Sequence, residues 1–170
     1  EACEDAWWRS MEELVPILER EGINLHIEPH PEDWTETLQP SVDLIRTVNS
    51  PRVKFLYCTP HTFYIGDDTV AMLRECADVL AQVHIADTFN HKASSGLRYI
   101  INPPGSAARV HQHRNIGQGE VPWDDVYRTL AEIGFDGIMT ACVFAWEDKA
   151  DASGTFMRAE MQRYIDKYFK

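Results

Sequence analysis

The chain has 170 residues, of which 44% are hydrophobic and 25% are charged, and its formal net charge is −11. This composition predicts a globular protein with a sizeable core and excludes a disordered or low-complexity chain. The acidic balance disfavours nucleic acid as a partner, because like charges would repel a phosphate backbone. A small neutral or metal-held substrate fits this composition better.

No apolar run approaches the roughly 20 residues that a membrane-spanning helix needs, and no signal-peptide pattern opens the chain. The cysteines lack the paired density of a small disulfide scaffold. They are Cys3, Cys58, Cys76 and Cys142. We therefore expect reduced thiols in a soluble, cytoplasmic protein with no membrane partner, and the sequence leaves a homo-oligomer open.

Along the chain, the spacing of apolar residues alternates between the helical and the extended period. Pro16 is expected to kink or split the first helix, whereas Gly22 and Gly134 are typical of helix ends. The pattern predicts, in chain order, a helix over 4–21, a strand over 23–28, a helix over 38–49, a strand over 53–58, a helix over 69–81, a strand over 82–86, a helix over 122–133, a strand over 137–144 and a helix over 155–169.

Residues 87–120 form a long connection that is rich in glycine, proline, serine and histidine. Connections of this length within a compact domain are usually functional. We therefore expect residues of this segment to contribute to a site.

Strands that recur about every 30 residues and are each followed by a helix predict βαβ units and a parallel sheet. A closed (β/α)8 TIM barrel takes about 250 residues. We therefore predict a single α/β domain over residues 1–170 that is the C-terminal half or more of a TIM barrel and lacks the N-terminal strands. The alternative is an open, doubly wound four-stranded sheet, which is disfavoured because the chain has no glycine-rich phosphate loop.

Chemically active side chains follow the ends of the predicted strands. Glu28 ends the first strand, Cys58 ends the second and is followed by His61, and His84 lies in the third. Parallel strands deliver their C-terminal ends to one rim, so these side chains are expected to converge on one metal ion.

Five motifs resemble successive rim motifs of the xylose-isomerase-like TIM barrels, a superfamily of sugar-phosphate isomerases and epimerases, inosose isomerases and dehydratases, and endonuclease IV-type repair enzymes. The motifs are Leu25-His-Ile-Glu28-Pro, Cys58-Thr-Pro-His61, Val83-His84-Ile-Ala-Asp87, His113-Arg-Asn-Ile-Gly-Gln-Gly119 and Gly134-Phe-Asp-Gly137-Ile. The segments 57–64, 93–105 and 142–147 look most like the barrel proteins of bacterial myo-inositol catabolism. The resemblance covers nearly the whole chain.

The resemblance implies that Glu28 is a metal ligand that also acts as an acid or base, and that His84 is a second ligand. The chain departs from the family at two positions, because Cys58 stands where the family has an aspartate and Cys142 where it has a glutamate. Either the two thiols bind a softer ion such as Zn²⁺, or they are inert and the ion has moved. The inert alternative is favoured, because buried unpaired cysteines commonly behave as small apolar residues.

In the repair branch, a further zinc is bound by residues that match His61, His111 and His113. Three imidazoles would leave one coordination position open for water or substrate. The resemblance therefore adds these histidines to the candidate ligands, although His61 has an alternative role in hydrogen bonding to a substrate hydroxyl.

The remaining candidates are substrate-binding residues. Asp87 is expected to hold substrate or orient a ligand, and the alternation of strand residues turns His26 to the same side as Glu28. The basic loop residues Lys92 and Arg98 would meet a carboxylate, phosphate or enediolate of the substrate. Trp146 would form an aromatic wall against a sugar ring.

Together these observations predict a metal-dependent isomerase or epimerase that acts on a cyclitol or a sugar-derived keto compound, in myo-inositol catabolism. The expected cofactor is one or more divalent ions (Zn²⁺, Mn²⁺ or Mg²⁺), and the expected catalytic residues are Glu28 and His61. The alternatives are a dehydratase or lyase on an inosose-like substrate, an endonuclease IV-like phosphodiesterase and a catalytically inactive sugar-binding barrel.

Overall fold

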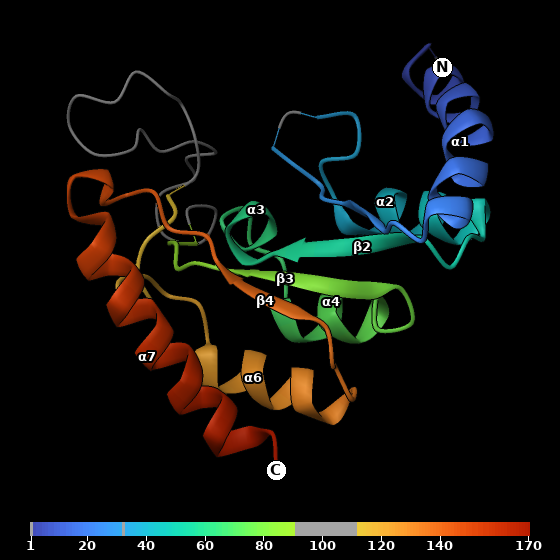
Figure 1. Cartoon of the computed structure of the whole chain (residues 1–170). Coiled ribbons are helices and arrows are strands. Elements are labelled where there is room, and N and C mark those ends of the chain that lie inside the picture. The colour runs from blue at the N-terminus through green and yellow to red at the C-terminus, as the bar shows by residue number, and fades with distance from the viewer. Residues whose placement is uncertain (1, 32, 91–111) are drawn as a thin grey trace.

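The structure, a computed structural model, describes residues 2–31, 33–90 and 112–170. Figure 1 shows its elements and their labels. In chain order these are α1 (Ala2–Glu21), β1 (Leu25–Ile27), α2 (Leu38–Val48), β2 (Val53–Cys58), α3 (Thr59–Phe63), α4 (Thr69–Glu75), β3 (Leu80–Ile85), α6 (Trp123–Glu132), β4 (Ile138–Ala141), the 3-10 helix η1 (Glu147–Lys149) and α7 (Ala150–Tyr168). Within the described ranges, no helix combines the length and the apolar character needed to cross a membrane.

The strands form one four-stranded parallel sheet in the order β1-β2-β3-β4 (Figure 1). Each strand lies beside its neighbour in the sequence, because the intervening helices return the chain to the start of the next strand. The register pairs Cys58 with His84 and His84 with Thr140. The C-terminal ends of the strands therefore meet at one edge of the sheet.

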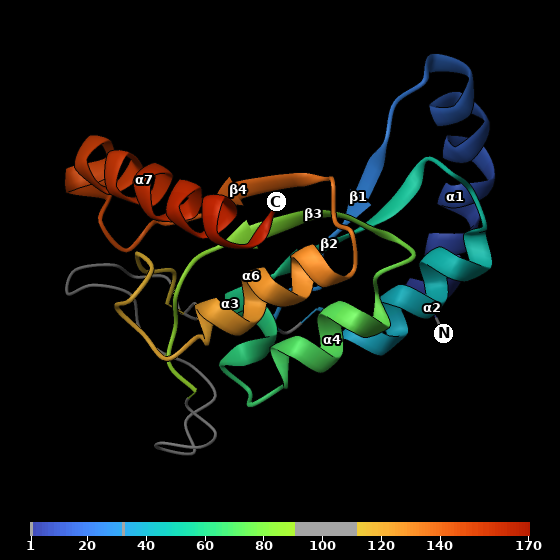
Figure 2. The ribbon, with the colours of Figure 1, turned by 90° about the horizontal axis from the view of Figure 1, so that it is seen from below.

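The two faces of the sheet differ because successive strand residues point to opposite sides. Phe55 and Tyr57 of β2 and Val83 and Ile85 of β3 are almost fully buried and belong to the core. Helices α2, α4 and α6 lie along one side of the sheet (Figure 2), and they contribute to the same core Val42, Ile45, Leu73, Val126 and Leu130. The opposite face carries polar side chains of the candidate site.

Neighbouring helices follow the order of the strands. Arg46 of α2 forms ion pairs with Glu75 and Asp78, at the end of α4 and just beyond it, and Arg74 of α4 pairs with Glu132 of α6. Exposed pairs of this kind each contribute about 0–1 kcal/mol, so the apolar core stabilises the arrangement more than they do. A sequential strand order with these helices on one side is the arrangement of an arc of a barrel, and it differs from the two-sided cover of a doubly wound sheet.

The element boundaries differ from the predictions in a few places. Helix α1 continues through Pro16 and is not split there. Helix α4 ends at Glu75, well before residue 81, because the Phe55 amide donates to Val79 O at 2.8 Å and draws the following residues into the sheet. The sequence analysis missed α3, whose first turn contains Pro60; proline is favoured there because it lacks the amide proton that would be unpaired anyway.

Candidate metal centre

The ends of β1, β2 and β3 bring three of the predicted ligands together. Glu28 follows β1, Cys58 ends β2, and His84 lies opposite Cys58 in β3. One potential ligand atom of each residue lies within 4.8 Å of those of the other two, and we call this group the first triad. His84 Nδ1 is 3.1 Å from Glu28 Oε1. The group lies where parallel strands were expected to deliver it.

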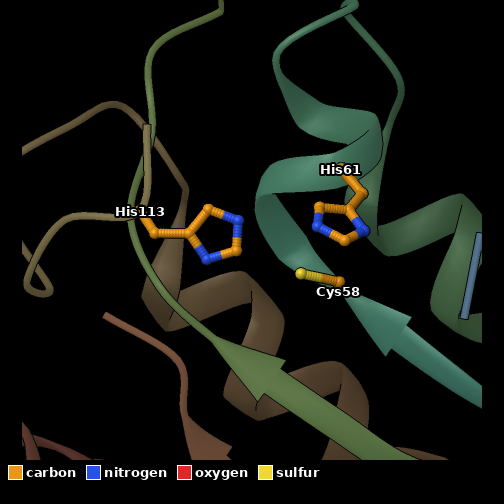
Figure 3. Close-up of side chains that lie close together, drawn as sticks. All are labelled: Cys58, His61 and His113. Atoms are coloured by element: carbon orange, nitrogen blue, oxygen red, sulfur yellow. The ribbon is translucent and has the colours of Figure 1, made fainter. Parts of the chain in front are cut away.

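Cys58 also belongs to a second triad, which it forms with His61 and His113. Their potential ligand atoms again lie within 4.8 Å of one another, and Figure 3 shows the two imidazole rings facing each other beside the Cys58 sulfur. His61 is held by α3, and His113 directly precedes the isolated bridge between Arg114 and Asp87. His111, the third histidine expected here, lies outside the described residues.

Cys142 completes the cluster. It directly follows β4, and its amide donates to Ile85 O at 3.0 Å. Electrostatic interactions with the Cys58 thiol and with the imidazoles of His113 and His84 lower the pKa of its thiol. Cys58 lies beside imidazoles in both triads, which would suit a soft ion, and the choice between an ion-binding and an inert role for Cys58 and Cys142 stays a prediction.

Burial and contact shift the pKa values of the cluster. Burial opposes ionisation of Glu28, but its hydrogen bond to His84 and the charges of His61 and His84 together lower its pKa. Burial likewise opposes the imidazolium of His84, yet hydrogen bonds to Cys142 and Glu28 raise its pKa to about 9. Burial raises the pKa of Cys58, whereas the hydrogen bond to Cys58 lowers that of Cys142. Negative charge is therefore favoured on Glu28 and Cys142.

The donor types of this cluster fit a divalent metal. A carboxylate oxygen, an imidazole nitrogen and thiolate sulfurs are the ligands that Zn²⁺ takes in proteins. Mg²⁺ and Mn²⁺ prefer oxygen donors, and among these residues only Glu28 offers one. With cysteines at positions 58 and 142, the donor set therefore favours a softer ion.

Gln82 orients His84 and was missed by the sequence analysis. Its Oε1 accepts a hydrogen bond from His26 Nδ1 at 2.8 Å, and its Nε2 lies 3.3 Å from His84 Nε2 and donates to Thr140 Oγ1 at 3.1 Å. A contact at Nε2 turns the Nδ1 edge of His84 toward Glu28. The signal was available, because Gln82 lies two residues before His84 on the same face of the strand. His26 reaches the cluster through Gln82, and its contact with substrate stays a prediction.

Asp87 has a structural role in place of the expected substrate contact. Its side chain is 0% exposed. Oδ1 accepts hydrogen bonds from the amides of Thr88 and Val121, and Oδ2 accepts from the Gly117 amide and from Trp123 Nε1, at 2.7–3.1 Å. With four protein donors around it, the carboxylate holds the segment before α6 against the end of β3.

Of the other expected substrate-binding residues, the structure describes only Trp146. Trp146 is partly buried and donates from Nε1 to Gln118 Oε1 at 2.8 Å, so it anchors the rim segment that leads to η1. Lys92 and Arg98 lie outside the described residues. Their roles stay predictions.

The thiols are expected to differ in their reactivity toward iodoacetamide at pH 7. Cys76 is fully buried and its pKa is raised to about 12 by burial, so almost no thiolate forms. Cys142, with a lowered pKa and partial exposure, should react about tenfold faster or more. Peptide mass mapping measures both rates, and saturating Zn²⁺ should slow the reaction of Cys142 but not that of exposed Cys3. Equal rates for Cys142 and Cys76, or no protection by zinc, would contradict this expectation.

The buried imidazole of His61 is expected to make the metal-free protein sensitive to acid. Burial lowers its pKa from 6.5 to about 4, so between these values the unfolded chain binds a proton that the folded chain does not. Stability should therefore fall as the pH is lowered from 6.5 to 4, by up to about 3 kcal/mol at about 1.4 kcal/mol per pKa unit. Urea denaturation of the protein and of His61→Asn measures this, and the variant should show the shallower slope. Identical slopes would refute the assignment.

Residues 1–160 match the sequence profile of a family described as xylose isomerase-like TIM barrel. The chain belongs to this family. The predicted fold class, part of a (β/α)8 barrel, is thereby confirmed, and the four parallel strands are consecutive strands of such a barrel.

The relatives are barrels about twice as long. The inosose isomerase of Bacillus licheniformis is 26% identical over 163 residues, which cover 93% of this chain and 54% of that protein. Among solved structures, the IolI protein with a bound zinc atom has a TM-score of 0.68 at 22% identity, covering 95% of this chain and 56% of its own. A xylose isomerase domain protein from Planctomyces limnophilus has a TM-score of 0.67 at 20% identity, with 94% and 51% covered. This chain thus spans about half the length of these relatives.

Proposed function

We propose that the chain carries the metal-binding part of an isomerase that acts on a cyclitol or a sugar-derived keto compound, in the breakdown of inositol. The observation that carries this proposal is the first triad, in which Glu28 lies 3.1 Å from His84 and close to Cys58 at the ends of adjacent parallel strands. Two likenesses support it, to an inosose isomerase in sequence and to a zinc-bound IolI protein in structure.

In this proposal Glu28, Cys58 and His84 hold a divalent ion, with Cys142 as a fourth ligand, and the donor set favours Zn²⁺. When bound, such an ion polarises the carbonyl and hydroxyl oxygens of a substrate. The hydrogen bonds of Gln82 fix the orientation of His84, so the site is held in place by the sheet itself.

Glu28 is the proposed base. Its lowered pKa keeps it ionised at neutral pH, as a proton acceptor requires. It removes the proton from the carbon next to the carbonyl, and the electron pair of that C–H bond forms the double bond of an enediolate. Glu28 then returns the proton to the former carbonyl carbon, while a hydroxyl proton passes to the other oxygen. The carbonyl has moved by one carbon, and no further reactant is consumed.

The number of carboxylates favours isomerisation over epimerisation. A proton that moves between neighbouring carbons on one face needs a single base, whereas inversion at one carbon needs groups on both faces. In the part of the chain that the structure describes, Glu28 supplies the one carboxylate in the two triads. The resemblance to the family implies that Cys142 takes the place of a second carboxylate, so isomerisation is better supported than epimerisation.

The test is solvent exchange in D₂O. The zinc-loaded chain is incubated with inososes and keto-sugars, and mass spectrometry and NMR should show metal-dependent deuterium incorporation at the carbon next to the carbonyl. A product lighter by one water would indicate a dehydratase instead. Tight binding of these compounds with no deuterium incorporation would overturn the isomerase and indicate a binding protein.

A further inference from the structure

The side chain of Gln82 joins two imidazoles on the inner face of the sheet. Its carboxamide lies between His26 of β1 and His84 of β3, with 2.8 Å from Oε1 to His26 Nδ1 and 3.3 Å from Nε2 to His84 Nε2. Strand β2 lies between β1 and β3, and side chains of alternate strands meet in this way inside a barrel. A carboxamide has one accepting end and one donating end, so the two rings face opposite ends of it.

In the structure, the accepting end of the carboxamide faces His26. The oxygen of Gln82 only accepts hydrogen bonds, so His26 carries its proton on Nδ1. The amide nitrogen only donates, so His84 accepts at Nε2, and Nδ1 carries the proton that is donated to Glu28 over 3.1 Å. In this arrangement the lone pair of His84 points to Gln82 and away from Glu28.

An ion at the first triad requires the opposite pattern. Nδ1 of His84 faces Glu28, so it is the nitrogen that would bind an ion together with Glu28, and a metal-bound nitrogen carries no proton. The proton of the ring is then on Nε2, and it needs an acceptor, as the second nitrogen of a metal-binding histidine usually has. Gln82 supplies this acceptor when its carboxamide rotates by half a turn. A charged His84, with protons on both nitrogens, requires the same rotated carboxamide.

The surroundings of Gln82 permit this rotation. Thr140 Oγ1 accepts from Gln82 Nε2 at 3.1 Å, but a hydroxyl can equally donate to the carboxamide oxygen. On its other side, His26 Nε2 is buried and has no hydrogen-bond partner among the residues that the structure describes. Within this part of the chain, the orientation of Gln82 therefore decides which nitrogen of His26 carries the proton.

We propose that Gln82 couples His26 to the metal site, so that binding of the ion rotates the carboxamide and moves the proton of His26 from Nδ1 to Nε2. This inference rests on the proposed function for its ion. His26 stays neutral, because exchange with water removes one proton from Nδ1 and returns one to Nε2. Gln82 and His26 are thus positioning residues that act on the ion through His84.

The experiment observes the imidazole rings directly. The histidines are labelled with ¹⁵N, and long-range ¹H–¹⁵N correlation spectra of the zinc-loaded chain at neutral pH show which ring nitrogen carries a proton, a lone pair or zinc. The variant His26→Phe identifies the signals of His26. The reference ring is His30, because its Nδ1 donates to Pro31 O at 3.0 Å and a carbonyl oxygen cannot become a donor. This measurement on the unmodified chain does not depend on the folding of any variant.

Two substitutions of Gln82 separate the coupling from simple packing. Gln82→Glu keeps the shape of the side chain but presents an acceptor to both rings, so His84 keeps its partner at Nε2 while His26 donates from Nδ1. Gln82→Met fills a similar space without a strong donor or acceptor. Gln39→Glu makes the same chemical change at the exposed start of α2 and is the matched control. Competition with a fluorescent chelator measures zinc affinity, and circular dichroism verifies that the metal-free variants fold.

In the zinc-loaded state we expect the proton of His26 on Nε2 in the unmodified chain and on Nδ1 in Gln82→Glu. Zinc affinity should fall about tenfold or more in Gln82→Met and should be kept or raised in Gln82→Glu. The control Gln39→Glu should bind zinc as the unmodified chain does.

Two results would overturn the coupling and leave the proposed function standing. One is an unmodified chain with zinc on His84 Nδ1 and the proton of His26 still on Nδ1. The other is an equal loss of zinc affinity in Gln82→Glu and Gln82→Met, which would indicate a packing role. Zinc that leaves the signals of His84 unchanged would overturn the first triad, and both proposals with it.

Discussion

Replacing Glu28 by glutamine is expected to lower kcat for the isomerisation about a thousandfold, the middle of the range for loss of a positioned general base. The amide keeps the shape of the side chain but accepts no proton. Loss of its negative charge should also weaken zinc binding, because Glu28 is one of the first-triad ligands. Steady-state kinetics at saturating Zn²⁺, together with the zinc content of each sample, separates the loss of the base from the loss of the ion.

The control for this variant is Glu13→Gln, which removes an exposed carboxylate from α1 and should leave kcat unchanged. Glu28→Gln samples that contain the full complement of zinc and turn over within about twofold of the unmodified chain would contradict the assignment of Glu28 as the base.

Replacing Asp87 by alanine is expected to lower the free energy of unfolding by about 4 kcal/mol, measured by urea denaturation without substrate. The substitution leaves four donors in a buried region without their acceptor, namely the amides of Thr88, Gly117 and Val121 and the indole of Trp123. A substrate-binding residue on an open rim would show no such loss. The measurement therefore separates the structural role from the one that the sequence suggested.

Two further variants test the interpretation of Asp87→Ala. Asp136→Ala removes an exposed carboxylate before β4 and should change stability by less than about 0.5 kcal/mol. Gly119→Ala should destabilise the same segment, because its Cβ would lie less than 3 Å from Thr88 O and Asp87 Oδ1. A loss below about 1 kcal/mol for Asp87→Ala would contradict the structural role.

The strands and their parallel order were predictable because strand patterns are local. Apolar runs such as Val53–Cys58 are separated by segments with helical spacing that are long enough to form a crossover helix. A βαβ connection of this kind joins parallel strands, so the strands were expected to be parallel neighbours. The convergence of Glu28, Cys58 and His84 followed from that topology. The ligand positions were therefore accessible before any coordinates, since each one ends or nearly ends a strand.

The remaining features depend on contacts between distant parts of the chain. Asp87 follows a strand at the rim, as a metal ligand would. It is buried because hydrogen-bond donors about 30 or more residues away in the sequence surround its carboxylate. Likewise, nothing local showed that the thiol of Cys58 would lie within 4.8 Å of ligand atoms of both His61 and His113. The length of α4 was overestimated because Leu80 suits a helix face as well as it suits β3.

The most direct measurement of the central claim is anomalous diffraction at the zinc absorption edge from crystals of the zinc-loaded chain. The account predicts an anomalous peak bounded by the carboxylate of Glu28, the thiol of Cys58 and the imidazole of His84. A map with no peak among these three side chains, or with zinc only at the molecular surface, would contradict it.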